Sequence, residues 1–393
     1  MLRDKRLKNR EPLLYVLRNA EVYAPEAMGI CDVWVGGGKV VAIAQAGEQA
    51  TNGFPQIDLQ GLRLLPGFID QHIHLIGAGG KTGFSSMTSE IPLEDLMECG
   101  TTTAVGLLGT DGSTRSVKSL YAKVKALEEE GMSAYMFTGY YGLEPTYITG
   151  SLQDDMIFID KVLGCKVAIA DIRSSYPTDL ELLRLLRNVR VAGRIGGKKG
   201  ILHLHLGAQK TALDPLFRIV KEHEFPIENI SPTHVGRYEA LFEQAIAFAK
   251  LGGMIDITTG ASKYTDPWRS VIHALDQGVD IHKMTFSTDG YAGLDAHDEN
   301  GNVIGTRPAP IHTNKEQAFK LHTQGGLPLS EAIKPITVNP ATNLGLRHKG
   351  RIAVGADADF VVINEEMEIE QVYCKGMSMR PSAAVGQIVA IPS

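Results

Sequence analysis

Two histidines separated by one residue, His72 and His74, stand at the end of the apolar run in "GFIDQHIHLIGAGG". Side chains two positions apart on a β-strand point to the same face, so both imidazoles can reach one metal ion. Three further strand-like runs end in residue types that bind metals, namely His205, His234 and Asp289. Imidazole and carboxylate ligands suit zinc, with cobalt, manganese or iron as alternatives. The pattern therefore predicts a metal centre.

His203 forms a second His-x-His pair with His205 in "GILHLHLG". Only one member of this pair needs to be a ligand. We favour His205 because it lies nearer the end of the predicted strand, and we interpret His203 as structural.

Lys166 lies in the apolar run "GCKVAIADIR", where a buried ammonium group would be costly. One interpretation is a side chain that extends to the end of the strand and reaches water. The other is a deprotonated lysine that captures carbon dioxide, because a carbamate has two oxygens and a two-metal site needs an anionic bridge. The residues alone leave both interpretations open.

The elements that must position these residues follow a repeating pattern between residues 66 and 345. Eight apolar runs, beginning with "GFIDQHIH" and ending with "KMTFSTDG", are mostly separated by helix-like segments such as "SLYAKVKALEEEG". This alternation predicts an α/β (β/α)8 TIM barrel, in which functional residues lie at the carboxyl ends of the strands. A doubly wound open sheet is the alternative, although no GxGxxG motif supports a dinucleotide site.

Residues 1–65 and 346–393 contain short β-branched runs between Gly and Asp turns, and "DVWVGGGKVVAIA" is typical of a β-hairpin. We expect both termini to form one small β-sandwich domain beside the catalytic barrel of residues 66–345.

Composition excludes several classes of protein. The 393 residues carry a net charge of −6 with no basic tract, which argues against a nucleic-acid partner. No apolar run approaches the roughly 18 residues that a membrane span needs. The first residues lack the apolar stretch of a secretory signal, and the four cysteines are widely spread, so we expect a cytoplasmic protein without disulfides.

The segments "PGFIDQHIHL", "HLHLG", "PTHVGR" and "STDG", together with Lys166, resemble the amidohydrolase superfamily. "GICDVWVGGGKVVAIA", "VGLLGTDG", "EEGMSAYMFTG", "YITGS" and "GADADFVVI" make the chain most similar to bacterial isoaspartyl (β-aspartyl) dipeptidases of peptidase family M38. This similarity extends over nearly the whole chain, from about residue 13 to residue 375.

The resemblance implies a site with two zinc ions. His72 and His74 would bind one ion with Asp289, and His205 and His234 would bind the other. Carbamylated Lys166 and a hydroxide would bridge both ions. The hydroxide would attack the amide carbon, and Asp289 would take its proton and pass it to the leaving amine.

The resemblance also assigns residues that recognise the substrate. Tyr141 would donate a hydrogen bond to the developing oxyanion, with Tyr140 as the alternative. Arg173 and Arg237 would hold the carboxylate of the leaving half. The remaining positions, which would contact the aspartyl half, are Gly79 and Thr110. The implied partner is a small dipeptide-like molecule, and the relatives imply a homo-oligomer, for example an octamer.

Two positions depart from the family pattern. Lys81 stands where the family has a glutamate that binds the free α-amino group of the substrate, and Gly293 or a neighbour stands where the family has a serine. A lysine repels an ammonium group and attracts an anion. The acyl half could therefore lack a free amine, another acid such as Glu144 or Glu90 could bind it, or Lys81 could point to solvent.

The leading hypothesis is a binuclear zinc hydrolase that cleaves isoaspartyl dipeptides or close analogues. Alternatives within the superfamily are a hydrolase of N-acyl amino acids or of acyl dipeptides without a free α-amine, and a cyclic-amide hydrolase. A non-catalytic binding protein that retained the fold is disfavoured, because every expected ligand position is filled.

Overall fold

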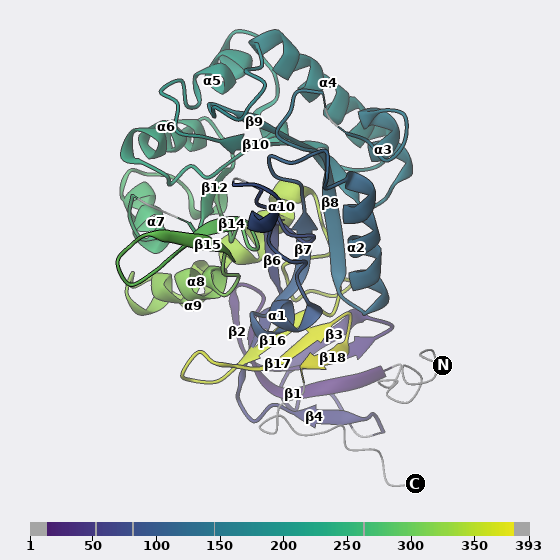
Figure 1. Ribbon diagram of the computed structural model, residues 1–393. Coiled ribbons are helices and arrows are strands. Elements are labelled where there is room, and N and C mark those ends of the chain that lie inside the picture. Colours follow the sequence, from purple (N-terminus) through teal and green to yellow (C-terminus); the bar gives the residue numbers. More distant parts are fainter. Residues whose placement is uncertain (1–13, 52, 81, 145, 262–263, 381–393) are drawn as a thin grey trace.

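The computed structural model describes residues 14–51, 53–80, 82–144, 146–261 and 264–380. Its centre is an eight-stranded parallel sheet in which the strands follow one another in chain order (Figure 1). These strands are β6 (Phe68–Ile73), β7 (Thr101–Gly106), β8 (Ser133–Gly139), β9 (Val162–Ile169), β10 (Ile201–Leu206), β11 (Ile230–Thr233), β12 (Ile255–Thr258) and β13 (Met284–Ser287). All eight coincide with apolar runs in the sequence. The predicted (β/α)8 barrel is confirmed.

The sheet closes between its first and last strands. Ile73 and Gly290 form a parallel bridge, the amide of Asp289 donates to the carbonyl of His72 at 3.1 Å, and the amide of His74 donates to the carbonyl of Gly290 at 2.9 Å. Closure therefore sets the residues after β13 directly against those that end β6.

Helices surround the barrel and cover its strands (Figure 1). Their apolar faces are buried against the sheet, as the Leu- and Val-rich stripe of the longest one shows. That helix begins with a capping box between Thr178 and Glu181, which satisfies otherwise unpaired backbone amides. The helices are α1 (Leu93–Glu98), α2 (Val117–Glu129), α3 (Leu152–Phe158), α4 (Asp179–Ile195), α5 (Asp214–Lys221), α6 (Glu239–Lys250), α7 (Pro267–Asp276), α8 (Thr313–Thr323), α9 (Leu329–Ala332) and α10 (Val338–Leu344). None of the described helices is long and apolar enough to cross a membrane.

Both ends of the chain contribute to a second eight-stranded sheet, beside the barrel in Figure 1. It pairs the early strands with the late ones through antiparallel contacts between β5 and β16. Its strands are β1 (Leu14–Tyr23), β2 (Ala27–Gly36), β3 (Lys39–Gln45), β4 (Gln56–Asp58), β5 (Arg63–Pro66), β16 (Phe360–Ile363), β17 (Ile369–Cys374) and β18 (Met377–Arg380). The domain limits at residues 65/66 and 345/346 stay a prediction.

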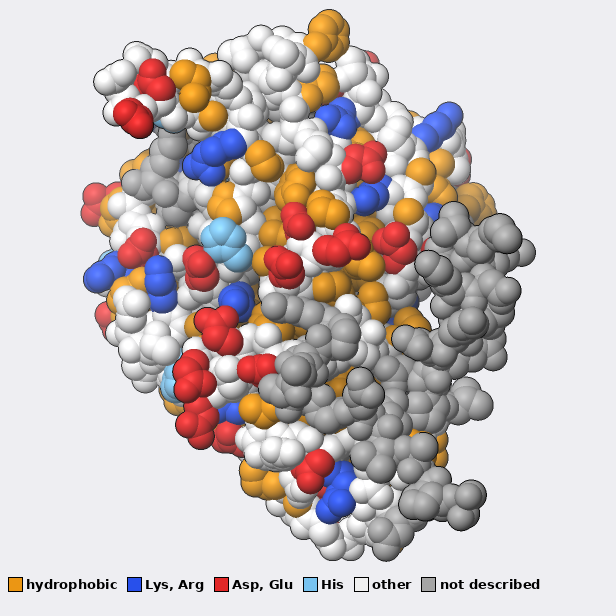
Figure 2. Space-filling model, turned by 60° about the horizontal axis from the view of Figure 1, so that its bottom comes forward, with side chains coloured by type: hydrophobic (Ala, Val, Ile, Leu, Met, Phe, Trp, Pro, Cys, Tyr) orange, Lys and Arg blue, Asp and Glu red, His pale blue; other side chains and the backbone are white. Residues whose placement is uncertain are grey.

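A buried ammonium group joins the two parts of the molecule. Lys349 donates to Ser133 on β8 at 2.6 Å and to Asp359 beside β16 at 2.5 Å, and it lies 2.7 Å from Asp357. The neighbouring carboxylates hold the pKa of Lys349 above its usual range despite burial. The described face in Figure 2, which includes the terminal sheet, mixes acidic, basic and hydrophobic side chains without a continuous basic area.

A hairpin follows the last barrel strand, formed by β14 (Gly293–His297) and β15 (Val303–Pro308). It begins close to the glycine-rich loop after β6, since a Cβ atom added at Gly293 would lie 2.9 Å from the Cα atom of Gly79. The hairpin was not expected from the sequence.

Candidate active site

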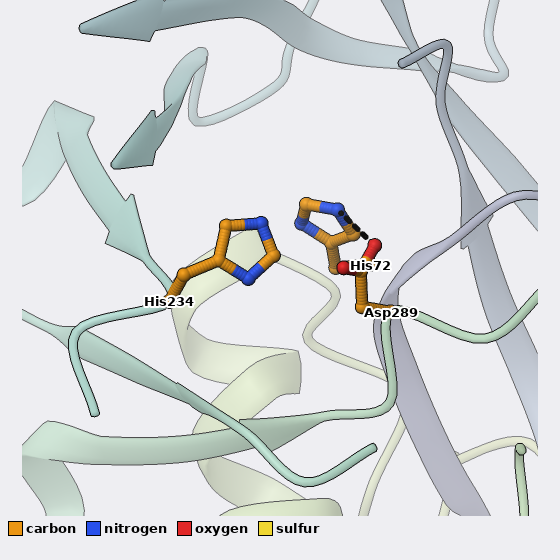
Figure 3. A group of neighbouring side chains, drawn as sticks. All are labelled: His72, His234 and Asp289. Carbon is orange, nitrogen blue, oxygen red and sulfur yellow. Dashed lines mark ion pairs between the residues drawn. The ribbon is translucent and has the colours of Figure 1, made fainter. Parts of the chain in front are cut away.

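The carboxylate of Asp289 and two histidines meet at the carboxyl end of the barrel. Asp289 Oδ1 lies 3.2 Å from His72 Nε2 and 3.1 Å from His74 Nε2. His72, His234 and Asp289 each present one ligand atom, and these atoms lie within 4.8 Å of one another (Figure 3). The side chains come from three strand ends, β6, β11 and β13, so the arrangement depends on barrel closure.

Asp70 holds the first and last strands in place beneath this cluster. Its Oδ1 atom accepts from the amides of His72 at 3.1 Å and Thr288 at 3.3 Å, and its Oδ2 atom accepts from the Thr288 hydroxyl. Asp289 and His234 both adopt positive φ angles, 54° and 64°. Non-glycine residues rarely adopt this conformation, and such strain is concentrated at functional sites.

Lys166 is fully buried on β9 and faces the same cluster. Its Nζ atom lies 3.2 Å from His72 Nε2 and 5.6 Å from the centre of the Tyr141 ring. Burial lowers the pKa of Lys166 to about 7, although the charges of Asp289 and Asp256 oppose the shift. The side chain does not reach water, and near neutral pH a large fraction of it is an uncharged amine that can act as a nucleophile.

His205 and His234 lie side by side, with ring centres 4.5 Å apart. His234 Nδ1 is 2.5 Å from the Thr258 hydroxyl, whereas its buried Nε2 atom has no hydrogen-bond partner among the described residues. Burial holds the pKa values of both histidines well below the usual range. Neutral imidazoles are the form that binds metals.

His203 is engaged by protein groups on every side. Its Nε2 atom lies 2.8 Å from His72 Nδ1, its Nδ1 atom lies 3.1 Å from the Ser231 hydroxyl, and its ring stacks on Phe137. The contact with His72 Nδ1 helps fix the orientation of the His72 ring. The geometry favours a structural role for His203.

Tyr141 follows β8 and is buried, while its neighbour Tyr140 is only partly buried. The Tyr141 hydroxyl lies 2.7 Å from His205 Nδ1. Burial raises the pKa of Tyr141 above its usual range, so the phenol keeps its proton and can donate a hydrogen bond. The Tyr140 ring instead packs against Gly112 and Gly142.

Beside the cluster lies an open cavity of about 510 Å³. Three residues singled out from the sequence line it, namely Gly79, Thr110 and Arg173. Gly79 has a φ of 111°, and a Cβ atom there would lie 2.3 Å from the Ser86 carbonyl oxygen, so only glycine fits this loop. Lys81 lies outside the described residues.

Arg237 lies on the other side of the histidines, in a small pocket with His234 and Thr258. It is half-buried, and its guanidinium group makes no hydrogen bond or ion pair within the described ranges. Arg173, by contrast, is held by Asp171 through two hydrogen bonds of 2.9 and 2.7 Å. Both arginines can reach the space around the cluster.

Two carboxylates were missed from the sequence. Asp111 lines the cavity and accepts hydrogen bonds from the amides of Ser113 and Thr114. Asp171 is buried between Arg173 and His205. The sequence indicated these two residues only by their position, since each follows a barrel strand by a few residues. Glu90 and Glu144, considered as amine-binding residues, are exposed and are not among the residues that line the cavity.

These side chains fit a metal centre. His72, His234 and Asp289 present ligand atoms within 4.8 Å of one another, and His74 Nε2 lies 3.1 Å from Asp289 Oδ1. The buried Nε2 atom of His234 has no partner among the described residues, and Lys166 Nζ lies 3.2 Å from His72 Nε2, close enough to add a bridging group. Every donor is nitrogen or oxygen, and zinc binds both in proteins.

Known proteins match the chain in both sequence and fold. The sequence profile of the amidohydrolase family matches residues 63–379. The β-aspartyl dipeptidase of Fervidobacterium islandicum AW-1, solved with a β-Asp-Leu dipeptide, is 38% identical with a TM-score of 0.89, covering 97% of this chain and 100% of that one. A second structure from this organism is 37% identical with a TM-score of 0.86, covering 96% and 99%.

Curated relatives are more distant. The adenine deaminase of Desulfitobacterium hafniense (strain Y51) is 25% identical over 400 residues, which cover 95% of this chain and 61% of the deaminase. The chain therefore spans less than two thirds of that relative's length. The reaction named for this relative differs from that named for the β-aspartyl dipeptidase.

Proposed function

The chain belongs to the amidohydrolase family and is a hydrolase that resembles the isoaspartyl dipeptidases, and we propose that it cleaves the amide bond of β-aspartyl dipeptides with two zinc ions per subunit. The observation that carries the proposal is the meeting of His72, His74 and Asp289 beside buried Lys166 and two arginines. A metal centre flanked by groups that bind carboxylates suits a short, doubly charged amide substrate.

His72, His74 and Asp289 would hold one ion, and His205 and His234 the other. Lys166 would add carbon dioxide at its neutral Nζ atom, which forms an N–C bond and releases one proton. The resulting carbamate would offer two oxygens as metal ligands. When bound, the metal pair would supply an activated water and polarise the amide carbonyl.

The protein's own groups then divide the remaining work. Asp289, ionised and next to the metal position, would accept a proton from the attacking water and return it to the leaving amine. The Tyr141 hydroxyl would donate to the oxygen that gains charge. Arg173 and Arg237 would hold the carboxylate of the leaving residue, which keeps the scissile bond over the metal centre.

The carbamate predicts a pH dependence for assembly. We expect the reactivation rate of metal-free enzyme by zinc to rise about tenfold from pH 6 to pH 8 at constant dissolved carbon dioxide. The reason is that the neutral fraction of Lys166, with a pKa of about 7, increases from about a tenth to about nine tenths. The measurement is recovered activity against time after zinc addition.

Above pH 8 the rate should level off. A lysine with the ordinary pKa of 10.5 would instead gain about tenfold for each pH unit from pH 6 to pH 9 without levelling at pH 8, and that outcome would contradict the assignment. Three of the histidines add no titration in this window, since burial lowers the pKa of His72 to about 3 and holds those of His205 and His234 well below 6.5.

Lys81 bears on which acyl half the substrate carries, because it stands where the family resemblance implies a glutamate. If Asp111, which lines the cavity, binds the free amine, β-aspartyl dipeptides are the substrates. If Lys81 faces the acyl half, N-acylated or N-succinylated analogues are favoured. We expect Lys81→Glu to shift the ratio of kcat/KM for β-aspartyl-leucine over N-succinyl-β-aspartyl-leucine upward by about tenfold or more, as removal of a like charge beside an ammonium predicts.

The same panel with Lys250→Glu, a charge reversal on an exposed lysine in the last turn of α6, is the matched control and should leave the ratio unchanged. An unchanged ratio in Lys81→Glu would mean that Lys81 does not contact the acyl half.

A further inference from the structure

Asp171 connects two functional groups that the reaction uses for different purposes. Its Oδ2 atom lies 3.0 Å from His205 Nε2 and 2.7 Å from Arg173 Nη2, and its Oδ1 atom accepts from Arg173 Nε at 2.9 Å. The backbone amide of Arg173 also donates to Oδ1, at 2.8 Å. The Asp171 side chain is only 5% exposed, so these bonds are shielded from water.

The first consequence concerns His205. A carboxylate only accepts hydrogen bonds, so the proton of the neutral imidazole must lie on Nε2, where Asp171 receives it. This tautomer leaves a lone pair on Nδ1. In the structure the Tyr141 hydroxyl donates to this lone pair at 2.7 Å, so Nδ1 faces a residue of the candidate site. Carboxylates that fix a histidine in this way also raise its strength as a metal ligand.

The second consequence concerns Arg173. Asp171 occupies the edge of the guanidinium group formed by Nε and Nη2. Nη2 also lies 3.5 Å from His205 Nε2, whereas Nη1 makes no hydrogen bond to the described residues, and Arg173 lines the cavity of about 510 Å³. The guanidinium carbon also lies 5.2 Å from the Tyr141 ring centre. The side chain is thus held in one orientation before any substrate arrives.

We propose that Asp171 is a positioning residue that couples metal binding to recognition of the substrate carboxylate, because one buried carboxylate fixes both the His205 tautomer and the Arg173 fork. The inference rests on the proposed function, in which His205 binds metal and Arg173 binds the carboxylate of the leaving residue. It adds that a substitution at Asp171 changes zinc binding and carboxylate recognition together.

The test measures two quantities in the full-length holoenzyme and in Asp171→Asn, which keeps the size of the side chain. The first is zinc content per subunit across a series of buffered free zinc concentrations. The second is the ratio of kcat/KM for β-aspartyl-leucine over β-aspartyl-leucinamide, which lacks the carboxylate. We expect Asp171→Asn to weaken retention of one zinc ion by about 10- to 100-fold and to lower the ratio by about tenfold.

Two further variants separate the explanations. Arg237→Gln should lower the ratio and leave zinc affinity unchanged, which shows that the two measurements are independent. Asp179→Asn removes a carboxylate from a comparable two-bond pair with Arg218 on the surface, at 2.5 and 2.9 Å, and should change neither. If Asp171→Asn fails to fold by circular dichroism, Asp171→Glu, which retains the carboxylate at a longer reach, takes its place in the same comparison.

The inference is overturned if the Asp171 variant keeps either zinc affinity or the substrate ratio within about twofold of wild type. A wild-type enzyme that holds no zinc, or that shows no preference for the free carboxylate, would instead contradict the proposed function itself. The two failures can be distinguished, because the first appears in the Asp171 variant and the second in the wild-type enzyme.

Discussion

Lys166→Ala is expected to lose about 100- to 1,000-fold of the kcat/KM for β-aspartyl-leucine, on the scale of removing a principal electrostatic contact to the transition state. The Nζ atom lies 3.2 Å from His72 Nε2 in a fully buried position, so its removal takes the proposed bridging group out of the site. Alanine keeps the strand but leaves a space where the carbamate would lie. Zinc content should fall together with activity.

Short carboxylic acids provide the control for this interpretation. Acetate or propionate at high concentration should restore part of the activity of Lys166→Ala, because a free carboxylate can occupy the same space and offer two oxygens. Lys199→Ala is the matched variant, since Lys199 also has a pKa lowered by burial, to about 8, and lies outside the site. Wild-type turnover in Lys166→Ala would show that no carbamate bridge is needed.

Asp289→Asn is expected to lower kcat by about 100- to 10,000-fold, the range that general acid–base groups contribute. Although burial opposes ionisation, the nearby His234 ring and the hydrogen bonds from His72 and His74 hold the pKa of Asp289 well below its usual range. An amide has the same shape and can still face the metals, but it cannot accept the proton of the attacking water. The loss should therefore appear in kcat more than in KM.

Zinc analysis must accompany this measurement, because asparagine is also a weaker metal ligand. Variant Asp280→Asn, at an exposed carboxylate next to His282, serves as the control and should behave as wild type. If Asp289→Asn contains two zinc ions and turns over within about tenfold of wild type, Asp289 is not the group that moves the proton.

The barrel could be predicted because its strands are buried on both faces. Each one reads as a short apolar run, and β9 is buried along its whole length. The hairpin of β14 and β15 could not be predicted in this way. Its residues are mostly exposed, so no alternation of apolar and polar side chains marks its strands.

The residues of the candidate site also include some that the sequence could predict and some that it could not. His72, His74 and Asp289 could be predicted because residue type and strand end are both visible in the sequence. Asp171 and Asp70 could not, since their roles depend on hydrogen bonds between side chains that only barrel packing brings together. The choice between Tyr140 and Tyr141 likewise depended on the turn after β8, where Tyr141 is the one that reaches His205.

The central claim is that a pair of zinc ions held by these side chains cleaves β-aspartyl dipeptides. The most direct measurement is the release of leucine from β-aspartyl-leucine by the purified enzyme, before chelation, after chelation, and after return of zinc with bicarbonate. We predict activity that disappears as zinc is removed and returns in proportion to zinc, up to two ions per subunit. Leucine release that continues at full rate from zinc-free protein, or none from protein that holds two zinc ions, would contradict the account.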